Sequence, residues 1–374
     1  MPQLKYMKKF IQRNKDILTV LLILFFWRIY FIVTQSNTYR IVEREGYLGF
    51  LKTANFDGKF YLNIAQYGYQ GLDQAFFPFF PLAIRTLIFI GLEPISAAII
   101  IVSISLFLFL YFIAKLVRID YPGSTYIWVI LFFLSFPTSF FLGSIYTESL
   151  FLFLTILSFY CVRKKHIFLG GIIGGFAAGT RIVGIFLFPA LVYEVYEQQK
   201  KQKKRNIKAY LPLLFIPLGL FSYMGYLWYK YSDALLFVHQ QPLFGAGRSG
   251  GEIILLPQVI YRYFKIFISV PYHELLFTIS LMEFLTLFMG MLILFLGYKS
   301  NIRKSYLLFS FCVLLFPTLS GTLSSLPRYV LCAFAIFIYL GLLRNRIIKI
   351  VLIISGLIIE SIFAVLFFQG YFIA

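Results

Sequence analysis

The sequence is poor in charged residues and in cysteine. Only 13% of its 374 residues are Asp, Glu, Lys or Arg, and it has three cysteines. A soluble domain of this size carries about twice that share of charge, so a soluble globular class is excluded. Cys161, Cys312 and Cys332 lie in apolar segments, a setting typical of small packed side chains rather than of disulfides or metal ligands.

Motifs for nucleotides and metals are also missing. The sequence has no GxxxxGK[ST] phosphate loop, no HExxH and no His/Cys metal spacing. These absences argue against nucleotide-driven transport and metalloprotease chemistry. The acidic residues are too scattered to predict a metal site, so we expect neither a metal nor another cofactor.

Long apolar runs dominate what is present. Hydrophobic residues make up 60% of the chain, with a mean hydropathy of +0.84. Several runs approach the roughly 20 residues that a bilayer-spanning helix needs: Ile17–Val33, Ala97–Leu116, Tyr126–Leu142, Leu211–Tyr229, Leu275–Leu296 and Ile350–Phe368. They are apolar throughout, whereas barrel strands alternate. The sequence therefore predicts an all-α polytopic membrane protein, with residues 1–374 as one integral membrane domain.

The net charge of +19 comes from basic clusters in short gaps between the runs. These clusters are Lys5–Lys15, Lys115–Arg118, Arg163–Lys165, Lys200–Lys208, Lys299–Lys304 and Arg344–Lys349. Such spacing is the positive-inside pattern, and it predicts a cytoplasmic N-terminus. A nucleic-acid partner is not expected, because that would need a basic face on a folded soluble domain.

Placing every basic cluster inside predicts about 11 crossings. Residues 35–80 then form a large first loop outside and residues 230–273 a second one. The glycine-rich Ile167–Tyr193 is predicted to form two short helices that meet near Arg181, since broken helices are tolerated where they line a cavity. The polar residues beyond the cytoplasmic loops gather on the outer side: Asp57, Glu148, Arg181, His239, Arg248, Glu252 and Arg328. We therefore expect a site at the extracytoplasmic face.

Two carboxylates stand out on that side. Asp57 is a candidate general base that takes the proton of an acceptor hydroxyl; the alternative is a helix N-cap, since Gly58 follows. Glu148, between two apolar runs, is a candidate to orient an acceptor or hold a cation. Its alternative is a helix cap, or a glutamate whose carboxylate reaches the membrane interface.

Arg181 and Arg328 are the strongest candidates for phosphate ligands, because guanidinium groups bind phosphate through two hydrogen bonds and stay charged. A structural ion pair is the alternative for Arg181, and a simple interfacial arginine for Arg328. Arg248 lies in a glycine-rich loop, where a solvated charge is the alternative. His239 and Gln240 are further candidates, although a histidine in such a segment more often makes loop hydrogen bonds than takes part in catalysis.

Arg28, Glu283 and Glu360 lie inside apolar runs. Each could mark an ion path, as intramembrane charges often do. This motivates an alternative function, a lipid-linked sugar flippase or transporter without chemistry. We interpret the three residues as packed polar contacts between helices.

The ordered motifs indicate a family. Residues 56–69, FDGKFYLNIAQYGY, and residues 75–82, AFFPFFPL, resemble the PIG-V-like mannosyltransferases, whose pattern reads roughly Trp-Asp-x-x-Trp-Tyr-x-x-Ile-Ala-x-x-Gly-Tyr and then Phe-Phe-Pro-Leu-Tyr-Pro. Residues 136–151, FPTSFFLGSIYTESLF, residues 178–190 with their Thr-Arg pair, and Pro327-Arg328-Tyr329 resemble later motifs of this family in the same order.

The resemblance implies the GT-C glycosyltransferase fold, with an active site at the outer leaflet of the cell membrane, or of the ER membrane in a eukaryote. It implies transfer of a sugar from a polyprenyl-phosphate donor to a lipid or glycan acceptor, with inversion and without a metal. Asp57 matches the family's base, with Glu148 as a second catalytic candidate. The donor-binding candidates are Arg181, Arg328, Arg248 and Tyr61, and the acceptor or loop candidates are His239, Gln240 and Tyr329.

Three aromatic positions of the family pattern hold phenylalanine here. Phe56 and Phe60 stand where tryptophans are expected, and Phe80 stands where a tyrosine is expected. Ring stacking survives the first two changes, whereas the third removes a hydroxyl. These departures bear on the sugar and the acceptor more than on the fold.

Overall fold

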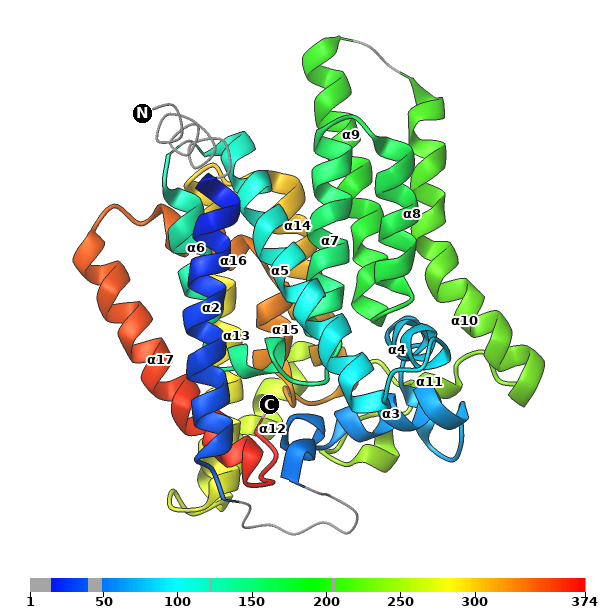
Figure 1. Ribbon diagram of the computed structural model, residues 1–374, viewed down its shortest axis with the longest axis vertical. Helices are drawn as coiled ribbons and strands as arrows, with labels where there is room; N and C mark the ends of the chain where they lie inside the picture. The colour runs from blue at the N-terminus through cyan, green and yellow to red at the C-terminus, as the bar shows by residue number, and fades with distance from the viewer. Residues whose placement is uncertain (1–14, 40–48, 122, 204–205, 374) are drawn as a thin grey trace.

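The computed structural model describes residues 15–39, 49–121, 123–203 and 206–373, and within these ranges it contains helices and loops but no strand (Figure 1). The longest helices are α2 (Lys15–Ser36), α5 (Pro94–Asp120), α10 (Phe215–Tyr231), α13 (Leu275–Lys299) and α17 (Arg346–Phe368). The shorter ones are α6 (Thr125–Leu134), α7 (Glu148–Arg163), α8 (Ile167–Ala178), α9 (Leu187–Gln202), α14 (Lys304–Leu315), α15 (Leu326–Cys332) and α16 (Ala335–Leu342). The all-α prediction is confirmed for the described residues.

Among the described residues, five helical segments are long and apolar enough to cross a membrane: Asp16–Ser36, Pro94–Asp120, Ile207–Tyr231, Leu275–Lys299 and Arg346–Phe368. Several shorter apolar helices accompany them, including α6 and α8. This composition fits a polytopic membrane protein. The count of about 11 crossings stays a prediction, as does the assignment of the whole chain to one domain.

Proline shortens one of the expected spans. The run Tyr126–Leu142 was expected to be one crossing, but α6 ends at Leu134 and a short 3-10 helix, η3 (Ser139–Leu142), follows. Pro137 lies in the gap; it has no backbone N–H to donate and disfavours helix in the residue before it. The polypeptide therefore turns before Glu148 rather than running on as one helix.

Glycines bring α8 and α10 into backbone contact. A Cβ atom on Gly219 of α10 would lie 1.9 Å from the carbonyl oxygen of Gly175 on α8, and one on Gly171 would lie 2.0 Å from the carbonyl oxygen of Pro212. Small residues permit such close approach between membrane helices, where dispersion contacts drive association. The prediction of two short helices meeting near Arg181 is confirmed, because α8 ends at Ala178 and η4 (Ile182–Phe186) leads into α9.

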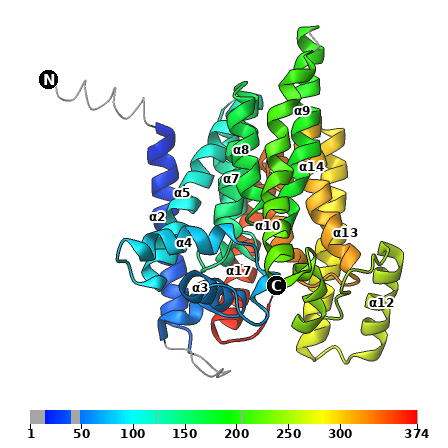
Figure 2. The same ribbon diagram turned by 90° about the vertical axis from the view of Figure 1, so that its right-hand side faces the viewer.

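The two predicted outer loops contain helices of their own. Within residues 35–80 the structure has η1 (Gly49–Ala54), α3 (Asp57–Tyr67), η2 (Asp73–Ala75) and the start of α4 (Phe79–Phe89); residues 40–48 are outside the described part. Residues 230–273 hold α11 (Leu236–His239), η6 (Gln241–Phe244) and α12 (Leu256–Ser269). Figure 2 shows α3, α4 and α12 at the same end of the helical bundle.

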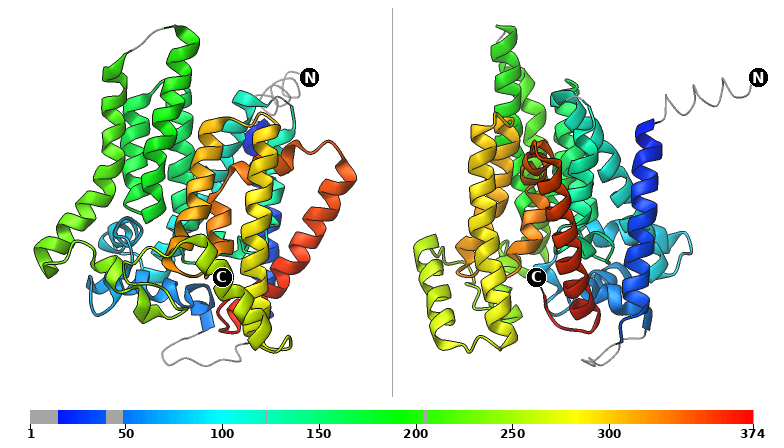
Figure 3. Two further views of the ribbon diagram at one scale, coloured as in Figure 1. Left: turned by 180° about the vertical axis from the view of Figure 1, so that it is seen from behind. Right: turned by 90° about the vertical axis from the view of Figure 1, so that its left-hand side faces the viewer.

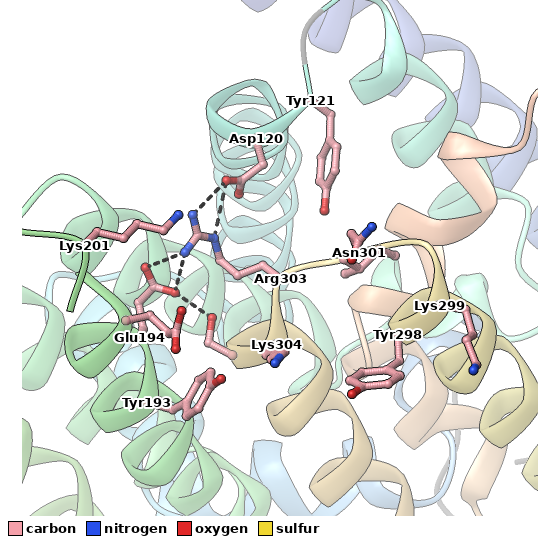
Figure 4. Close-up of a pocket in the computed structure, with 13 residues that line it drawn as sticks. Asp120, Tyr121, Tyr193, Glu194, Lys201, Tyr298, Lys299, Asn301, Arg303 and Lys304 are labelled. Carbon is pink, nitrogen blue, oxygen red and sulfur yellow. Dashed lines mark hydrogen bonds and ion pairs between the residues drawn. The ribbon is translucent and has the colours of Figure 1, made fainter. Parts of the chain in front are cut away.

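An ionic junction joins helices at the other end (Figure 4). Arg303, before α14, lies 3.1 Å from Asp120 Oδ1 on α5 and 3.2 Å from Glu194 Oε1 on α9. Arg163 at the end of α7 contacts the same two carboxylates at 2.8 and 3.5 Å. Asp120, Glu194 and Arg303 border a cavity of about 690 Å³. Because each carboxylate contacts both guanidiniums, we interpret this junction as a clamp between four helices.

The charged residues inside the apolar helices make contacts between helices. Arg28 of α2 donates to Ser103 Oγ of α5 at 3.0 Å, and Glu283 of α13 accepts from Tyr263 of α12 at 2.5 Å. Glu360 of α17 accepts a hydrogen bond from Tyr30 of α2. The view from behind shows α13 and α14 side by side, with α17 at the edge of the bundle (Figure 3). These contacts agree with the packing interpretation of the three residues.

Candidate functional site

Four charged residues from distant parts of the chain meet at the end that carries α3. Asp57 is the first residue of α3 and Glu148 the first residue of α7. Arg181 lies between α8 and η4, and Arg328 lies in α15. We call these four residues the ion network. It unites four of the positions that the sequence motifs singled out.

The ion network is held by short contacts. Arg328 Nη1 lies 2.7 Å from Asp57 Oδ2, while its Nε and Nη2 lie 3.0 and 2.9 Å from Glu148 Oε1. Arg181 Nη1 lies 2.5 Å from the same Glu148 oxygen and 3.1 Å from Thr147 Oγ1. Two carboxylates and two guanidiniums therefore balance one another. The ion pairing named as the alternative for Arg181 is therefore present, and phosphate binding by the two arginines stays a prediction.

Burial separates the roles of the two carboxylates. The Glu148 side chain is 0% exposed and Arg328 is 6% exposed, whereas Asp57 is 26% exposed. A buried charge is stable only when it is paired and hydrogen-bonded. Glu148 fills that need for both arginines but has no surface open to a substrate. Asp57 is the carboxylate of the network that can meet a reacting hydroxyl.

Aromatic rings pack against the guanidiniums. The Cζ atom of Arg328 lies 4.7 Å from the ring centroids of Phe141 and Tyr146. Arg181 Cζ lies 5.0 Å from the ring of Tyr329. Cation–π contacts of this kind stabilise an arginine in place where solvent is excluded. Tyr329 thus contacts the network through Arg181.

The backbone before Asp57 is pressed against the segment before Glu148. The amide of Ile145 donates to Thr53 O at 2.9 Å, and the Tyr146 hydroxyl donates to Asn55 O at 2.5 Å. A Cβ atom on Gly58 would lie 2.9 Å from Ile145 O, so only glycine fits this approach. Because the two segments touch, the motifs at residues 56–69 and 136–151 form one site.

Asp57 follows a strained residue rather than acting as a helix cap. Phe56 occupies the N-cap position with φ 56° and ψ −113°, and no side chain caps α3. A bulky residue with positive φ costs energy and occurs where surrounding contacts enforce it, often at functional sites. The N-cap alternative for Asp57 is therefore wrong.

A cavity of about 780 Å³ opens beside the ion network. Asp57, Arg181 and Arg328 line one wall. Phenylalanines form another wall, where Phe60 and Phe76 stack at 4.7 Å between centroids and Phe244 packs edge-on to Phe60 at 5.6 Å. The cavity thus offers a charged surface and an aromatic surface to one ligand, as sites for amphipathic molecules do.

The second outer segment brings Arg248 to the same cavity. Its guanidinium donates to Gln241 Oε1 at 3.1 Å and to Ser325 Oγ at 3.3 Å, both neutral side chains. Arg248 therefore adds a positive charge to a network that is otherwise balanced. Gln241 and Ser325 were not singled out from the sequence, because neither stands in a motif with known chemistry.

Tyr61 also lines the cavity, in α3 one turn after Asp57. Its side chain is buried, and this burial raises the pKa of Tyr61 above its usual range, with the nearby Asp57 charge adding to the effect. The phenol therefore stays protonated at neutral pH and is available as a hydrogen-bond donor.

His239 and Gln240 do not line this cavity. His239 Nδ1 lies 2.7 Å from Asp233 Oδ2, and this hydrogen bond lowers the pKa of the Asp233 carboxyl. Gln240 Nε2 donates to Gln74 Oε1 at 3.0 Å. The structure therefore separates these two candidates from the ion network, and Gln240 ties the second outer segment to the first.

The helical architecture and this site define a multi-helix membrane protein with a charged cavity, walled by aromatic rings, at one end of its bundle. A family model described as Mannosyltransferase (PIG-V) matches residues 35–238, more than half of the chain, and the chain belongs to this family. The resemblance found in the motifs is thus confirmed. No curated protein and no solved structure matches the chain. Asp57, Glu148 and Arg181 lie within the matched residues, and Arg328 lies beyond them.

Proposed function

We propose that the protein transfers a mannosyl residue from a polyprenyl-phosphate donor to a hydroxyl of a lipid or glycan acceptor, with inversion at the anomeric carbon. The observation that carries this proposal is the position of Asp57, the more exposed carboxylate of the ion network, which pairs with Arg328 and lines one cavity together with Arg181 and an aromatic wall. The family supports the mannosyltransferase class.

The reaction assigns each atom a destination. The Asp57 carboxylate takes the proton of the acceptor hydroxyl, and the acceptor oxygen bonds to the sugar C1 from the face opposite the phosphate. The bond between C1 and the phosphate oxygen breaks, and its electron pair stays on the phosphate. Arg181, Arg328 and Arg248 line the same cavity, where fixed positive charges stabilise the departing phosphate. No step requires a metal or another cofactor.

Glu148 serves this reaction as a positioning residue. Its Oε1 atom is in contact with three guanidinium nitrogens, and its side chain has no exposed surface. A proton transfer by Glu148 would break the pairing of both arginines. We therefore assign proton transfer to Asp57 alone.

The orientation follows from charge. The ionic junction of Arg163 and Arg303 belongs to two of the basic clusters, and Arg163 ends α7 at the opposite end from Glu148 of the ion network. The positive-inside rule places such clusters in the cytoplasm. The cavity would then open at the extracytoplasmic face of the membrane, within reach of a lipid-linked donor.

The departures from the family pattern concern different surfaces. Phe56 and Phe60 line the cavity, so rings there face the ligand even though the indoles are missing. Phe80 is 0% exposed and packs against Tyr61 at 5.2 Å between centroids. The hydroxyl lost at Phe80 is therefore a matter of packing, whereas the change at Phe56 and Phe60 bears on the choice of sugar or acceptor.

The test uses purified protein in detergent with a short-chain polyprenyl-phosphate mannose and a panel of acceptor lipids and glycans. Transfer, or slow hydrolysis of the donor, is expected with wild type and is expected to be lost in Asp57→Asn. Normal activity in that variant would remove the base assignment. An intact donor with every acceptor, for mannose and for other sugars, would overturn the transferase in favour of transport of a lipid-linked sugar, which liposome assays would detect.

A further inference from the structure

The charges of the ion network leave no surplus for a ligand. Asp57 and Glu148 together balance Arg181 and Arg328. A phosphate group that binds Arg181 or Arg328 must therefore share that guanidinium with one of the two carboxylates, whereas Arg248 lies outside the ion network and contacts neutral side chains. Arg328 is the guanidinium that touches both of them, and Asp57 is the more exposed partner.

The pairing of Arg328 is divided between its two sides. Its Nε and Nη2 face Glu148, while its Nη1 faces Asp57 at 2.7 Å. The rings of Phe141 and Tyr146 hold the guanidinium in place. Its contact with Asp57 can therefore be lost while Glu148 still holds the group in position.

We propose that Arg328 changes partner during the reaction, from the Asp57 carboxylate to the phosphate of the polyprenyl product. This proposal rests on the proposed function. A phosphodiester donor carries one negative charge, and ionised Asp57 carries another. After transfer, protonated Asp57 carries none and the phosphate monoester carries two. One negative charge thus moves from Asp57 to the phosphate. Arg328 is the cation that contacts Asp57, where this charge lies before the transfer.

This exchange gives Arg328 two effects. Protonation of Asp57 releases Arg328 at the moment when the leaving phosphate gains charge, so the base and the leaving group are coupled through one side chain. When Asp57 later gives its proton to water, its carboxylate competes again for Arg328. That competition weakens the binding of the product and favours its release.

The binding of farnesyl phosphate, a short polyprenyl monophosphate, tests the exchange. Asp57→Asn imitates the protonated base without changing its size, and we expect it to bind farnesyl phosphate at least about fivefold more tightly than wild type, the lower end of typical coupling between sites. Titration calorimetry of the detergent-solubilised protein measures this affinity. A merely structural role for Asp57 predicts equal or weaker binding.

Two comparisons separate this effect from a general change of charge. Glu252→Gln removes one negative charge from the lining of the same cavity, and we expect it to change the affinity far less than Asp57→Asn does. In an Arg328→Lys background, which keeps the charge but loses the guanidinium geometry, the gain caused by Asp57→Asn is expected to shrink. Size-exclusion profiles confirm that each variant is folded.

The outcomes distinguish the two proposals. If Asp57→Asn abolishes transfer but does not tighten binding, or if Glu252→Gln tightens it equally, the partner exchange is overturned and the base assignment stands. If Asp57→Asn still transfers mannose, the base assignment fails, and the partner exchange fails with it.

Discussion

Replacing Glu148 by glutamine tests whether its buried charge holds the two arginines of the ion network in place. The Glu148 side chain is 0% exposed and its Oε1 lies 2.5 Å from Arg181 and 2.9 Å from Arg328. Glutamine keeps the size but removes the charge, so two buried guanidiniums would share Asp57 as the one carboxylate of the network. Removing one partner of a buried ion pair costs about 3–5 kcal/mol of the free energy of unfolding.

That cost can be read as a thermal shift. Unfolding entropy near 2.1 cal/mol/K per residue implies about 1.3 °C per kcal/mol for a chain of this length. Glu148→Gln should therefore lower the midpoint of thermal unfolding by roughly 4–6 °C. Tryptophan fluorescence of the protein in detergent measures this midpoint. Glu252→Gln makes the same chemical change at an exposed position and should stay within about 0.5 kcal/mol of wild type.

The contrary result is informative. If Glu148→Gln abolishes transfer while the unfolding midpoint equals that of wild type, Glu148 does not act by holding the arginines, and a direct catalytic part must be assigned to it. If both activity and midpoint are unchanged, the buried network does not require its charge, and the reasoning from burial fails.

Three further substitutions have separate expected outcomes. Gly58→Ala places a Cβ atom 2.9 Å from Ile145 O and should reduce kcat in the transfer assay by displacing the start of α3. Gly219→Ala meets Gly175 O at 1.9 Å and should cost about 1–3 kcal/mol in stability, measured as a lower unfolding midpoint. His239→Ala should leave kcat and KM at wild-type values, because His239 does not line the cavity.

Each of these variants has a result that would contradict its reasoning. Full activity in Gly58→Ala would show that the approach to Ile145 is not needed. An unchanged midpoint in Gly219→Ala would mean that α8 and α10 can separate without cost, and Gly225→Ala in the same helix, with open space around it, is the matched control. Lost activity in His239→Ala would show that His239 takes part in the reaction.

The membrane helices were largely predictable because hydropathy acts locally. The expected spans Ala97–Leu116 and Leu275–Leu296 became α5 and α13, each a few residues longer. The exception, Tyr126–Leu142, shows the limit of that signal. Its residues are apolar to the end, but Pro137 prevents a continuous helix and the chain turns. Hydropathy describes what a segment prefers as surroundings and not where its backbone bends.

The members of the site were predictable, but their pairing was not. Asp57, Glu148, Arg181 and Arg328 stand out because charge is expensive among apolar runs. Their partners depend on contacts between segments up to 271 residues apart in sequence. Glu148 contacts both Arg181 and Arg328, and Arg328 contacts both Glu148 and Asp57. No local feature of the sequence predicts either pair of contacts. The position of His239 also had no local signal. Its imidazole suited a catalytic site, but the side chain does not line the cavity.

The order in which the network can form has a consequence for biosynthesis. Glu148 and Arg181 are 33 residues apart, so they can pair early, while Asp57 must wait for Arg328, which is 271 residues further along the chain. A ribosome must therefore have made nearly the whole protein before Asp57, the proposed base, can pair with Arg328 and before the wall of the cavity is complete. Truncated chains would lack a working site, so an unfinished enzyme would not consume the donor lipid.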